Sequence, residues 1–181
     1  MITLHHLNDS RSQRILWLLE ELGKPYEVVR YQRYPVTNLA PPELKAVHPL
    51  GKSPVITDGD QTVIESGAII EYLLERHGNG RLRPAPGTAD SGLYLQWSWF
   101  AEATFARPLG DIAQHTVVRP EPQRIPAVVE DAKLRTLVCL DALEAAVPAG
   151  RYLWTLVIYR QQLDGTFVQL QDAQGNVNIL G

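Results

Sequence analysis

Cysteine is almost absent from this chain, since Cys139 is the only one among 181 residues. A single cysteine excludes an intramolecular disulfide and any redox pair of cysteines, and it is typical of proteins from a reducing compartment. Long apolar runs are also lacking, because no stretch approaches the roughly 18 to 20 residues that a membrane span needs. The first residues show no basic segment followed by an apolar leader. We therefore expect a cytoplasmic protein without a membrane partner.

A strong charge of either sign is missing as well. Lysine and arginine together number 17 against 20 acidic residues, which leaves a net charge of -3. Such a balance gives no general electrostatic attraction to nucleic acid, and we expect no nucleic-acid partner. The five histidines show no metal-ligand spacing, so no metal site is expected. What the chain does have is 45% hydrophobic residues, enough to bury the core of one sizeable domain or two small ones.

The first part of the chain alternates short apolar runs with amphipathic stretches. Strands are predicted at 2–7 and 26–31 on either side of a helix over 11–22, which Gly23 and Pro25 would end. Because one helix separates the two strands, we expect a right-handed βαβ unit with the strands parallel.

A second group of elements follows a loop rich in proline. Residues 43–47 suit one or two helical turns, and 55–58 and 62–64 suit brief strands in a hairpin. The apolar spacing over 66–76 predicts a helix on one face, and Gly78 stands where it should stop. The predicted order is therefore βαβ, a short helix, then ββα.

The composition changes after this α/β region. Residues 79–90 carry two prolines and two glycines and are the best linker candidate. Stretches rich in alanine, leucine, glutamate and tryptophan over 90–112 and 127–146 then predict two helices of an all-α domain. Cys139 falls in an apolar part of the second helix, which favours a buried structural thiol over a reactive one.

The end of the chain changes character again. Runs at 155–159 and 166–171 are β-like and are separated by turn signals. The sequence thus predicts four parts: a first domain over 1–78, a linker over 79–90, a helical domain over 91–154 and a tail over 155–181.

Three polar motifs lie at the ends of the predicted elements. Asn8–Ser10 stands at the first strand-to-helix junction, where free N–H groups and the helix dipole favour a negative charge such as a thiolate. Ser53–Pro54 precedes a strand, where the proline can be cis and the Ser53 backbone can pair with a bound peptide. Glu65–Ser66 opens a helix that could hold a carboxylate, with Glu65 meeting an amino group. Taken singly, each motif is more often only a helix cap or an ordinary loop proline.

In this order and spacing the motifs resemble the glutathione S-transferase family, of the bacterial, serine type. The resemblance covers the whole first domain and extends into the helices after the linker. It implies a thioredoxin-like α/β domain, then an all-α domain, and a homodimer. The residues that carry it are Ser10 with Arg14, Ser53–Pro54, and Glu65–Ser66 followed by Ala68–Ile69 and Tyr72–Leu73.

The resemblance also implies how glutathione, as a co-substrate rather than a cofactor, would be bound. Ser53 would pair through its backbone with the cysteinyl part, and Pro54 would be cis. Glu65 and Ser66 would hold the γ-glutamyl end. Lys52 would assist at the glycyl carboxylate.

The reactive centre would lie at the start of the first helix. By the same resemblance, the Ser10 hydroxyl would hydrogen-bond the glutathione sulfur, with Ser12 as the second candidate. Trp97 and Phe100 suit either the core of the helical domain or, with Asn8, the wall of an apolar co-substrate pocket at the domain junction.

The C-terminal part departs from the family pattern. In the family a buried helix, announced by a Ser or Thr cap and an Asp three residues later, usually follows a segment like 150–153, and it is missing here. A recombination or frame change near Trp154 is one hypothesis for the switch. Losing that helix would expose apolar faces of the remaining helical domain. We expect the tail to cover them as a small hairpin or to be poorly ordered.

Three functions follow from these observations. The first is an enzyme that conjugates the thiolate of glutathione to small electrophilic compounds. The second is a glutathione-binding or partner-docking module with little turnover, which the partial helical domain favours. The third is a regulator that acts through protein contacts alone and does not bind glutathione.

Overall fold

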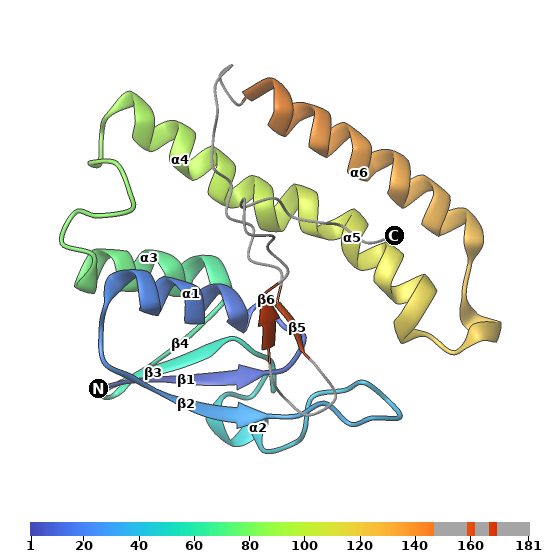
Figure 1. Ribbon diagram of the computed structural model, residues 1–181, viewed down its shortest axis with the longest axis horizontal. Coiled ribbons are helices and arrows are strands. Elements are labelled where there is room, and N and C mark those ends of the chain that lie inside the picture. Colours follow the sequence, from blue (N-terminus) through green and yellow to red (C-terminus); the bar gives the residue numbers. More distant parts are fainter. Residues whose placement is uncertain (147–158, 162–166, 170–181) are drawn as a thin grey trace. The chain divides into compact units, whose positions relative to one another are not determined.

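The computed structural model describes residues 1–146, 159–161 and 167–169 (Figure 1). The chain divides into two units, 1–142 and 143–181, and each is described by itself.

Four strands form one mixed sheet in the order β2-β1-β3-β4. The central strand β1 (Ile2–Leu7) is parallel to β2 (Tyr26–Tyr31) and antiparallel to β3 (Val55–Asp58). At the edge, β4 (Gln61–Ile64) is antiparallel to β3. The predicted strands, including the parallel pair, are confirmed. The turn Gly59–Asp60 joins β3 to β4, and Gly59 has φ 60°, a backbone conformation that glycine adopts without strain.

Three helices accompany this sheet. Helix α1 (Ser12–Leu22) and helix α3 (Ser66–His77) lie together on one side of it, and the short α2 (Leu44–Val47) lies on the other (Figure 1). Gly23, at φ 62°, ends α1 in the left-handed conformation as the sequence predicts, and its N–H donates to the Glu20 carbonyl at 3.0 Å. The whole arrangement is the expected thioredoxin-like α/β fold.

The core lies between the sheet and the two helices α1 and α3. Apolar residues three and four apart along each helix share one face, and alternate residues of β1 and β3 share one face of the sheet. Fully burying one such side chain contributes about 1.5 to 3 kcal/mol, so this layer holds the segments around the strand ends in place. Its buried members are Ile2, Leu4, Ile15, Leu18, Leu19, Leu22, Ile56, Ile69, Leu73 and Leu74.

Asp58, the last residue of β3, ties the β3–β4 turn to the end of α3. The Tyr72 hydroxyl donates to its Oδ2 at 3.1 Å, and Nε2 of His77 lies 3.4 Å from the same oxygen. Burial by itself would raise the pKa of Asp58. The hydrogen bonds from Tyr72 and His77, with the charges of His77 and the amino terminus, outweigh burial and hold this pKa below its usual value.

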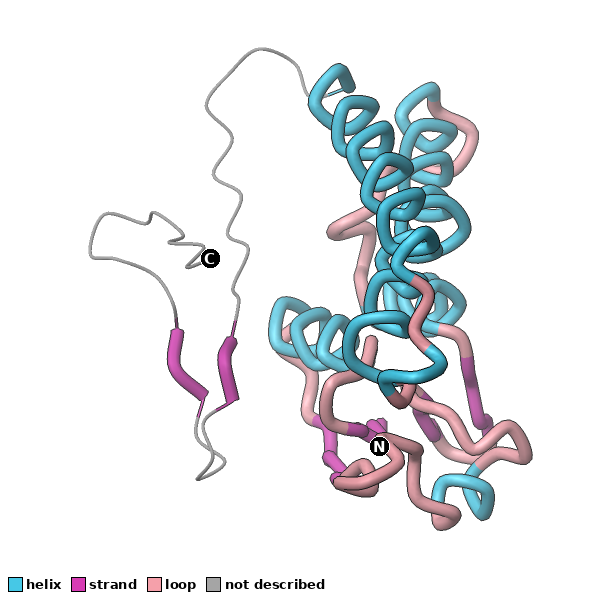
Figure 2. Tube along the Cα trace, turned by 90° about the vertical axis from the view of Figure 1, so that its right-hand side faces the viewer, coloured by secondary structure: helices cyan, strands magenta, loops and turns pink. Residues whose placement is uncertain are grey.

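The first stretch of the helical region begins at α4 (Ala89–Trp99), capped by the Thr88 side chain, which accepts from the Ser91 N–H. It continues through the π-helical turns Phe100–Phe105 into α5 (Ala106–Ala113) (Figure 2, helices in cyan). A further π-helical segment, Gln114–Val118, ends it. The predicted first helix over 90–112 is therefore present, with a wider turn near its middle.

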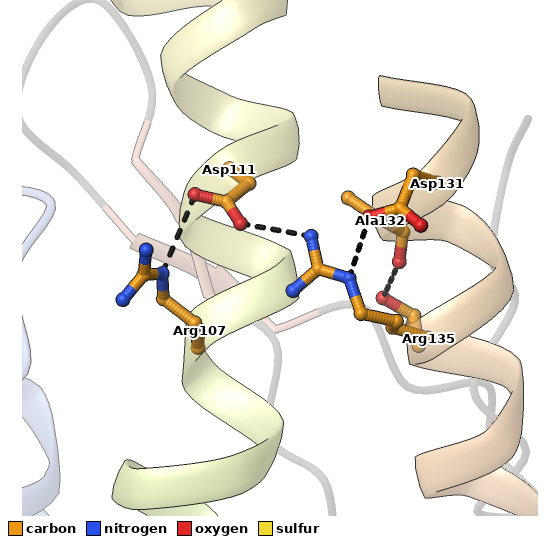
Figure 3. Close-up of polar contacts among 6 residues, drawn as sticks. Arg107, Asp111, Asp131, Ala132 and Arg135 are labelled. Carbon is orange, nitrogen blue, oxygen red and sulfur yellow. Dashed lines mark hydrogen bonds and ion pairs between the residues drawn. The ribbon is translucent and has the colours of Figure 1, made fainter. Parts of the chain in front are cut away.

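The second long helix, α6 (Pro126–Ala146), matches the helix predicted over 127–146. Figure 3 shows how it is joined to α5. The Arg135 guanidinium of α6 donates to Oδ2 of Asp111 on α5 at 3.0 Å, and to Oδ2 of Asp131 on its own helix at 2.8 Å. Cys139 on α6 is buried, which agrees with a structural thiol.

Both long helices expose large apolar side chains. On α6, Leu134 is 65% exposed and Val138 is 67% exposed, and on α4 Trp99 is 71% exposed. None of the residues of α4 is buried. This is the exposure of apolar helix faces that the sequence predicts. Within residues 1–146, no helix is long and apolar enough to cross a membrane.

In the tail, β5 (Tyr159–Gln161) and β6 (Phe167–Gln169) pair antiparallel. This pairing agrees with the predicted small hairpin for these residues, and its covering of the apolar helix faces stays a prediction. The rest of the predicted tail, and the expectation of poor order, lie outside the described residues. The division into domains at 78, 90 and 154 stays a prediction.

Candidate functional site

The segments that precede α1, β3 and α3 meet around an open hollow. Sheet topology brings them together, because β1 and β3 are neighbours and β4 leads directly into α3. The predicted glutathione-binding residues Lys52, Ser53, Pro54, Glu65 and Ser66 all lie in its lining. The other lining residues are Arg11, His48, Leu50, Ile64 and Glu102.

The Ser53 hydroxyl both donates and accepts a hydrogen bond, and these two bonds hold the loop before β3 against β1. The hydroxyl donates to the His5 carbonyl at 2.8 Å and accepts from the Leu7 N–H at 3.2 Å. The hydroxyl thus extends the β1–β3 pairing where Pro54, which has no N–H, cannot. The Ser53–Pro54 peptide bond is cis, as the resemblance implies. Ser53 precedes the paired part of β3, so its backbone groups have no partner in the β1–β3 ladder among the described residues.

Glu65 turns the chain sharply from β4 into α3. Its φ of 69° is in the left-handed region, which a residue other than glycine seldom adopts and which typically costs about 1 to 3 kcal/mol. The Ile69 N–H donates to the Glu65 carbonyl at 2.9 Å and begins the helical bonding. The preceding N–H groups of Ser66, Gly67 and Ala68 have no partner within the helix. They form the positive end of α3 at the hollow, which suits a carboxylate.

Arg11 and Glu102 bound the hollow from the α1 side and from the helical region. Nε of Arg11 lies 2.8 Å from Oε2 of Glu102, and Arg14 forms a second ion pair with the same carboxylate. Glu102 stands in the π-helical segment after α4, a kind of turn that is frequent at functional sites. This ion pair connects residues far apart in the sequence, and no local signal in the sequence indicated it.

Ser10 is half-buried beside Arg11, and it is not among the residues that line the hollow. Its hydroxyl donates to the Leu7 carbonyl at 2.8 Å and lies 2.7 Å from the Ser12 hydroxyl. Ser12 is fully buried, and its Oγ lies 2.7 Å from Nδ1 of His6. Ser12 is therefore shielded from a ligand, while Ser10 is half-buried and adjoins Arg11, which lines the hollow.

His6 is the titratable group of this cluster. Burial lowers the pKa of its imidazole, the Arg30 charge lowers it further, and the Asp9 charge acts in the opposite direction. The net pKa lies below the ordinary value of 6.5, so the ring is mainly neutral at pH 7. The sequence indicated His6 only as a strand residue.

The residues predicted for a co-substrate pocket are not brought to this hollow. Asn8 accepts the Arg33 N–H at its Oδ1, at 2.8 Å, and its amide donates to Asp9 at 2.9 Å. Trp97 and Phe100 contact one another edge to face at 5.1 Å. Asn8 thus holds the loop after β2, and a co-substrate role for Asn8, Trp97 and Phe100 stays a prediction.

The sequence missed His48 and Leu50 as lining residues. They lie in the segment before Ser53, which is dense in turn-forming residues, and the Leu50 N–H donates to Nδ1 of His48 at 3.3 Å. Loops held by a rigid scaffold often carry binding residues, so the position of His48 and Leu50 in a loop was the one feature of the sequence that could have indicated them. Among the described residues, no group of three or more His, Cys, Asp or Glu side chains could hold a metal ion.

Comparison with known proteins agrees with this geometry. Residues 1–75 match the family model described as "Glutathione S-transferase, N-terminal domain". The curated relative Glutathione S-transferase 3 of Schizosaccharomyces pombe is 45% identical over 104 residues, which are 58% of this chain and 42% of the relative. The N-terminal part of the chain, residues 1–75, belongs to the glutathione S-transferase family. The lining residues from Arg11 to Ser66 therefore lie within the part of the chain that matches the family model, and Glu102 lies outside it.

Solved glutathione transferases have the same fold. A glutathione S-transferase from Actinobacillus pleuropneumoniae is 35% identical with a TM-score of 0.69, over 81% of this chain and 66% of that one. The glutathione transferase URE2P8 from Phanerochaete chrysosporium, solved with oxidized glutathione, is 25% identical with a TM-score of 0.72, over 83% and 69%. The chain spans about half the length of the curated transferases it matches, with 42%, 49% and 51% covered in three of them.

Proposed function

We propose that this chain is a glutathione transferase that binds glutathione in the hollow and conjugates its thiolate to small electrophilic compounds. One observation carries the proposal: Lys52, the Ser53–Pro54 bend and Glu65–Ser66 line a single hollow, in the domain that matches the family. A similar transferase solved with oxidized glutathione supports the choice of ligand.

The charges around the hollow complement those of glutathione, which has two carboxylates and one ammonium group. The free N–H groups at the start of α3 would hold the γ-glutamyl carboxylate, and the exposed Glu65 would meet the ammonium. Lys52 would attract the glycyl carboxylate. Between them, the Ser53 backbone would pair with the cysteinyl residue as an added strand pairs with a sheet edge.

Ser10 would lower the pKa of the bound thiol by donating a hydrogen bond from its hydroxyl to the thiolate sulfur. A free thiol has a pKa near 8.5, and lowering it by two units requires about 2.7 kcal/mol of preference for the thiolate. A hydrogen bond to a charged group contributes roughly 1.5 to 3 kcal/mol, and a helix N-terminus roughly 0.3 to 1 kcal/mol. Ser10 and the start of α1 together suffice. The thiolate would then form the C–S bond, and the leaving group would depart with the bonding electrons of the electrophile.

The test compares Ser10→Ala with the wild type. Both should be retained on immobilised glutathione. The variant should raise the pKa of the bound thiol by one to two units, measured from the ultraviolet absorbance of the thiolate, and should conjugate a chloronitroarene about 10 to 100 times more slowly at neutral pH. Ser98→Ala is the matched control, because that exposed hydroxyl bonds only the Tyr94 carbonyl of its own helix at 2.7 Å.

The main alternative is a glutathione-binding or protein-interaction module with little turnover. The exposed apolar faces of α4 and α6 favour it, since such faces commonly mark contact surfaces. Retention on glutathione without conjugation that depends on Ser10 would support this alternative. Absence of any glutathione binding would contradict both functions.

The setting of this activity is part of the proposal. We propose a cytoplasmic homodimer of the bacterial, serine type, with a glutathione-binding domain over 1–78 and a helical domain after a linker over 79–90. The exposed apolar helix faces support a partner subunit. Analytical ultracentrifugation tests the proposed homodimer, because a dimer has twice the mass of the 20.3 kDa chain.

A further inference from the structure

A continuous chain of hydrogen bonds runs from Ser10 into the protein interior. Ser10 Oγ lies 2.7 Å from Ser12 Oγ, which lies 2.7 Å from Nδ1 of His6. Both hydroxyls also contact one acceptor, the Leu7 carbonyl, at 2.8 Å from Ser10 and 3.2 Å from Ser12. The Ser12 N–H donates to Ser10 Oγ at 3.3 Å. The proposed reactive hydroxyl is thus one member of a partly buried cluster with a single titratable end.

Counting protons shows what this cluster can do. Each serine has one hydroxyl proton. If Nδ1 of His6 has a free lone pair, Ser12 donates to it and Ser10 is the donor left for the Leu7 carbonyl. If Nδ1 carries a proton, it donates to Ser12, and Ser12 can then donate to the Leu7 carbonyl. Only in this second arrangement is the Ser10 proton free to turn outward without leaving that carbonyl unpaired.

We infer that Ser12 and His6 are positioning residues that free the Ser10 hydroxyl to donate a hydrogen bond to a bound thiolate when Nδ1 of His6 carries a hydrogen. The inference rests on the proposed function, because it concerns the hydroxyl that would meet the glutathione sulfur. Full burial of Ser12 excludes direct contact with the ligand. The role of Ser12 is to donate a hydrogen bond to the Leu7 carbonyl when the Ser10 hydroxyl turns away from that carbonyl.

The surroundings of His6 are consistent with a ring that changes tautomer rather than charge. Arg30 and burial disfavour the doubly protonated ring, and Asp9 favours it only in part. A thiolate at the far end of the chain of hydrogen bonds would favour donors that point toward it, and therefore the Nδ1–H form. Neighbouring His5 lies outside the cluster, because its Nδ1 is bonded to the Tyr31 hydroxyl at 3.0 Å.

The decisive experiment follows the imidazole nitrogens of His6 by ¹⁵N NMR in the full chain at pH 7. Glutathione and S-methylglutathione are added in turn, because the second lacks a thiolate. We expect glutathione to move His6 toward the Nδ1–H form and S-methylglutathione to leave it unchanged, with His5 unchanged by both. An equal response of His6 to both ligands, or none to glutathione, would overturn the inference. The measurement needs no variant, so it does not depend on whether a variant folds.

Ser12→Ala gives an independent readout. Without Ser12, the Ser10 hydroxyl stays hydrogen-bonded to the Leu7 carbonyl, so the pKa of the bound thiol should rise by about one unit, in the same direction as in Ser10→Ala. The Kd for S-methylglutathione should stay within about twofold. A wild-type thiol pKa in Ser12→Ala would contradict the relay while leaving the proposed function intact. Failure of the wild type to bind either ligand would instead overturn the proposed function, and the relay with it.

Discussion

Replacing Ser53 by alanine should destabilise the protein, although Ser53 lies in a loop that lines the hollow. Its hydroxyl makes two hydrogen bonds to β1, one to the His5 carbonyl and one from the Leu7 N–H. Leu7 is only 2% exposed, so water cannot replace the lost partner of its N–H. Ser53→Ala therefore leaves a buried donor without an acceptor, at the point where Pro54 already interrupts the pairing of β1 with β3.

The expected size follows from these two bonds. Each hydrogen bond contributes a net 0.5 to 1.5 kcal/mol, and an unpaired buried N–H costs about 1 to 3 kcal/mol. We expect Ser53→Ala to lower the free energy of unfolding by about 2 kcal/mol. For a urea m-value of about 2 kcal/mol/M, the midpoint of unfolding should fall by about 1 M with m unchanged.

The assay is urea unfolding followed by tryptophan fluorescence and by circular dichroism. Ser98→Ala is the matched control, since its exposed hydroxyl bonds a carbonyl of its own helix, and it should change stability by less than about 0.5 kcal/mol. If Ser53→Ala unfolds at the same urea concentration as this control, the hydroxyl does not hold the loop, and our account of the bend is wrong.

Two further predictions concern charged groups. Glu102→Gln removes both ion pairs with Arg11 and Arg14, which are half exposed, so unfolding in urea should be easier by at most about 1 kcal/mol. The difference from the wild type should shrink in high salt, and a salt-independent difference would contradict an electrostatic origin. For Asp58, whose pKa is lowered in the folded state, the stabilising contribution is present above the ordinary pKa of 3.8 and is lost as the pH falls through the folded value. Asp58→Asn should therefore be less stable than the wild type at pH 7, and urea midpoints should converge as the pH falls below 3.8; midpoints that stay equally far apart would refute this sign.

Much of the fold could be predicted because local patterns carry it. Apolar residues at helical spacing place the helix that ends at Gly23, and alternation places the strands around it. The β3–β4 turn at Gly59 also follows from residue chemistry. Element ends were less certain: α3 continues one residue beyond the prediction, to His77, because helix ends depend on tertiary contacts such as the one from His77 to Asp58.

The site could be predicted in part. Ser53–Pro54 and Glu65–Ser66 are short motifs whose spacing is informative, and the structure brings both to one hollow. The ion pair between Arg11 and Glu102 joins residues 91 positions apart. No periodicity or motif reports such a pair, because it depends on how two helices pack rather than on either sequence alone.

The sequence by itself determined the element order, the glycine and proline stops and the serines available for a thiolate. The tertiary structure decided what each serine can do. Ser10, Ser12 and Ser53 are chemically alike, yet folding leaves Ser10 half-buried, buries Ser12 against His6 and bonds the Ser53 hydroxyl to β1. The physical reason is that a hydroxyl has one proton, and only the packed structure determines which acceptor receives it.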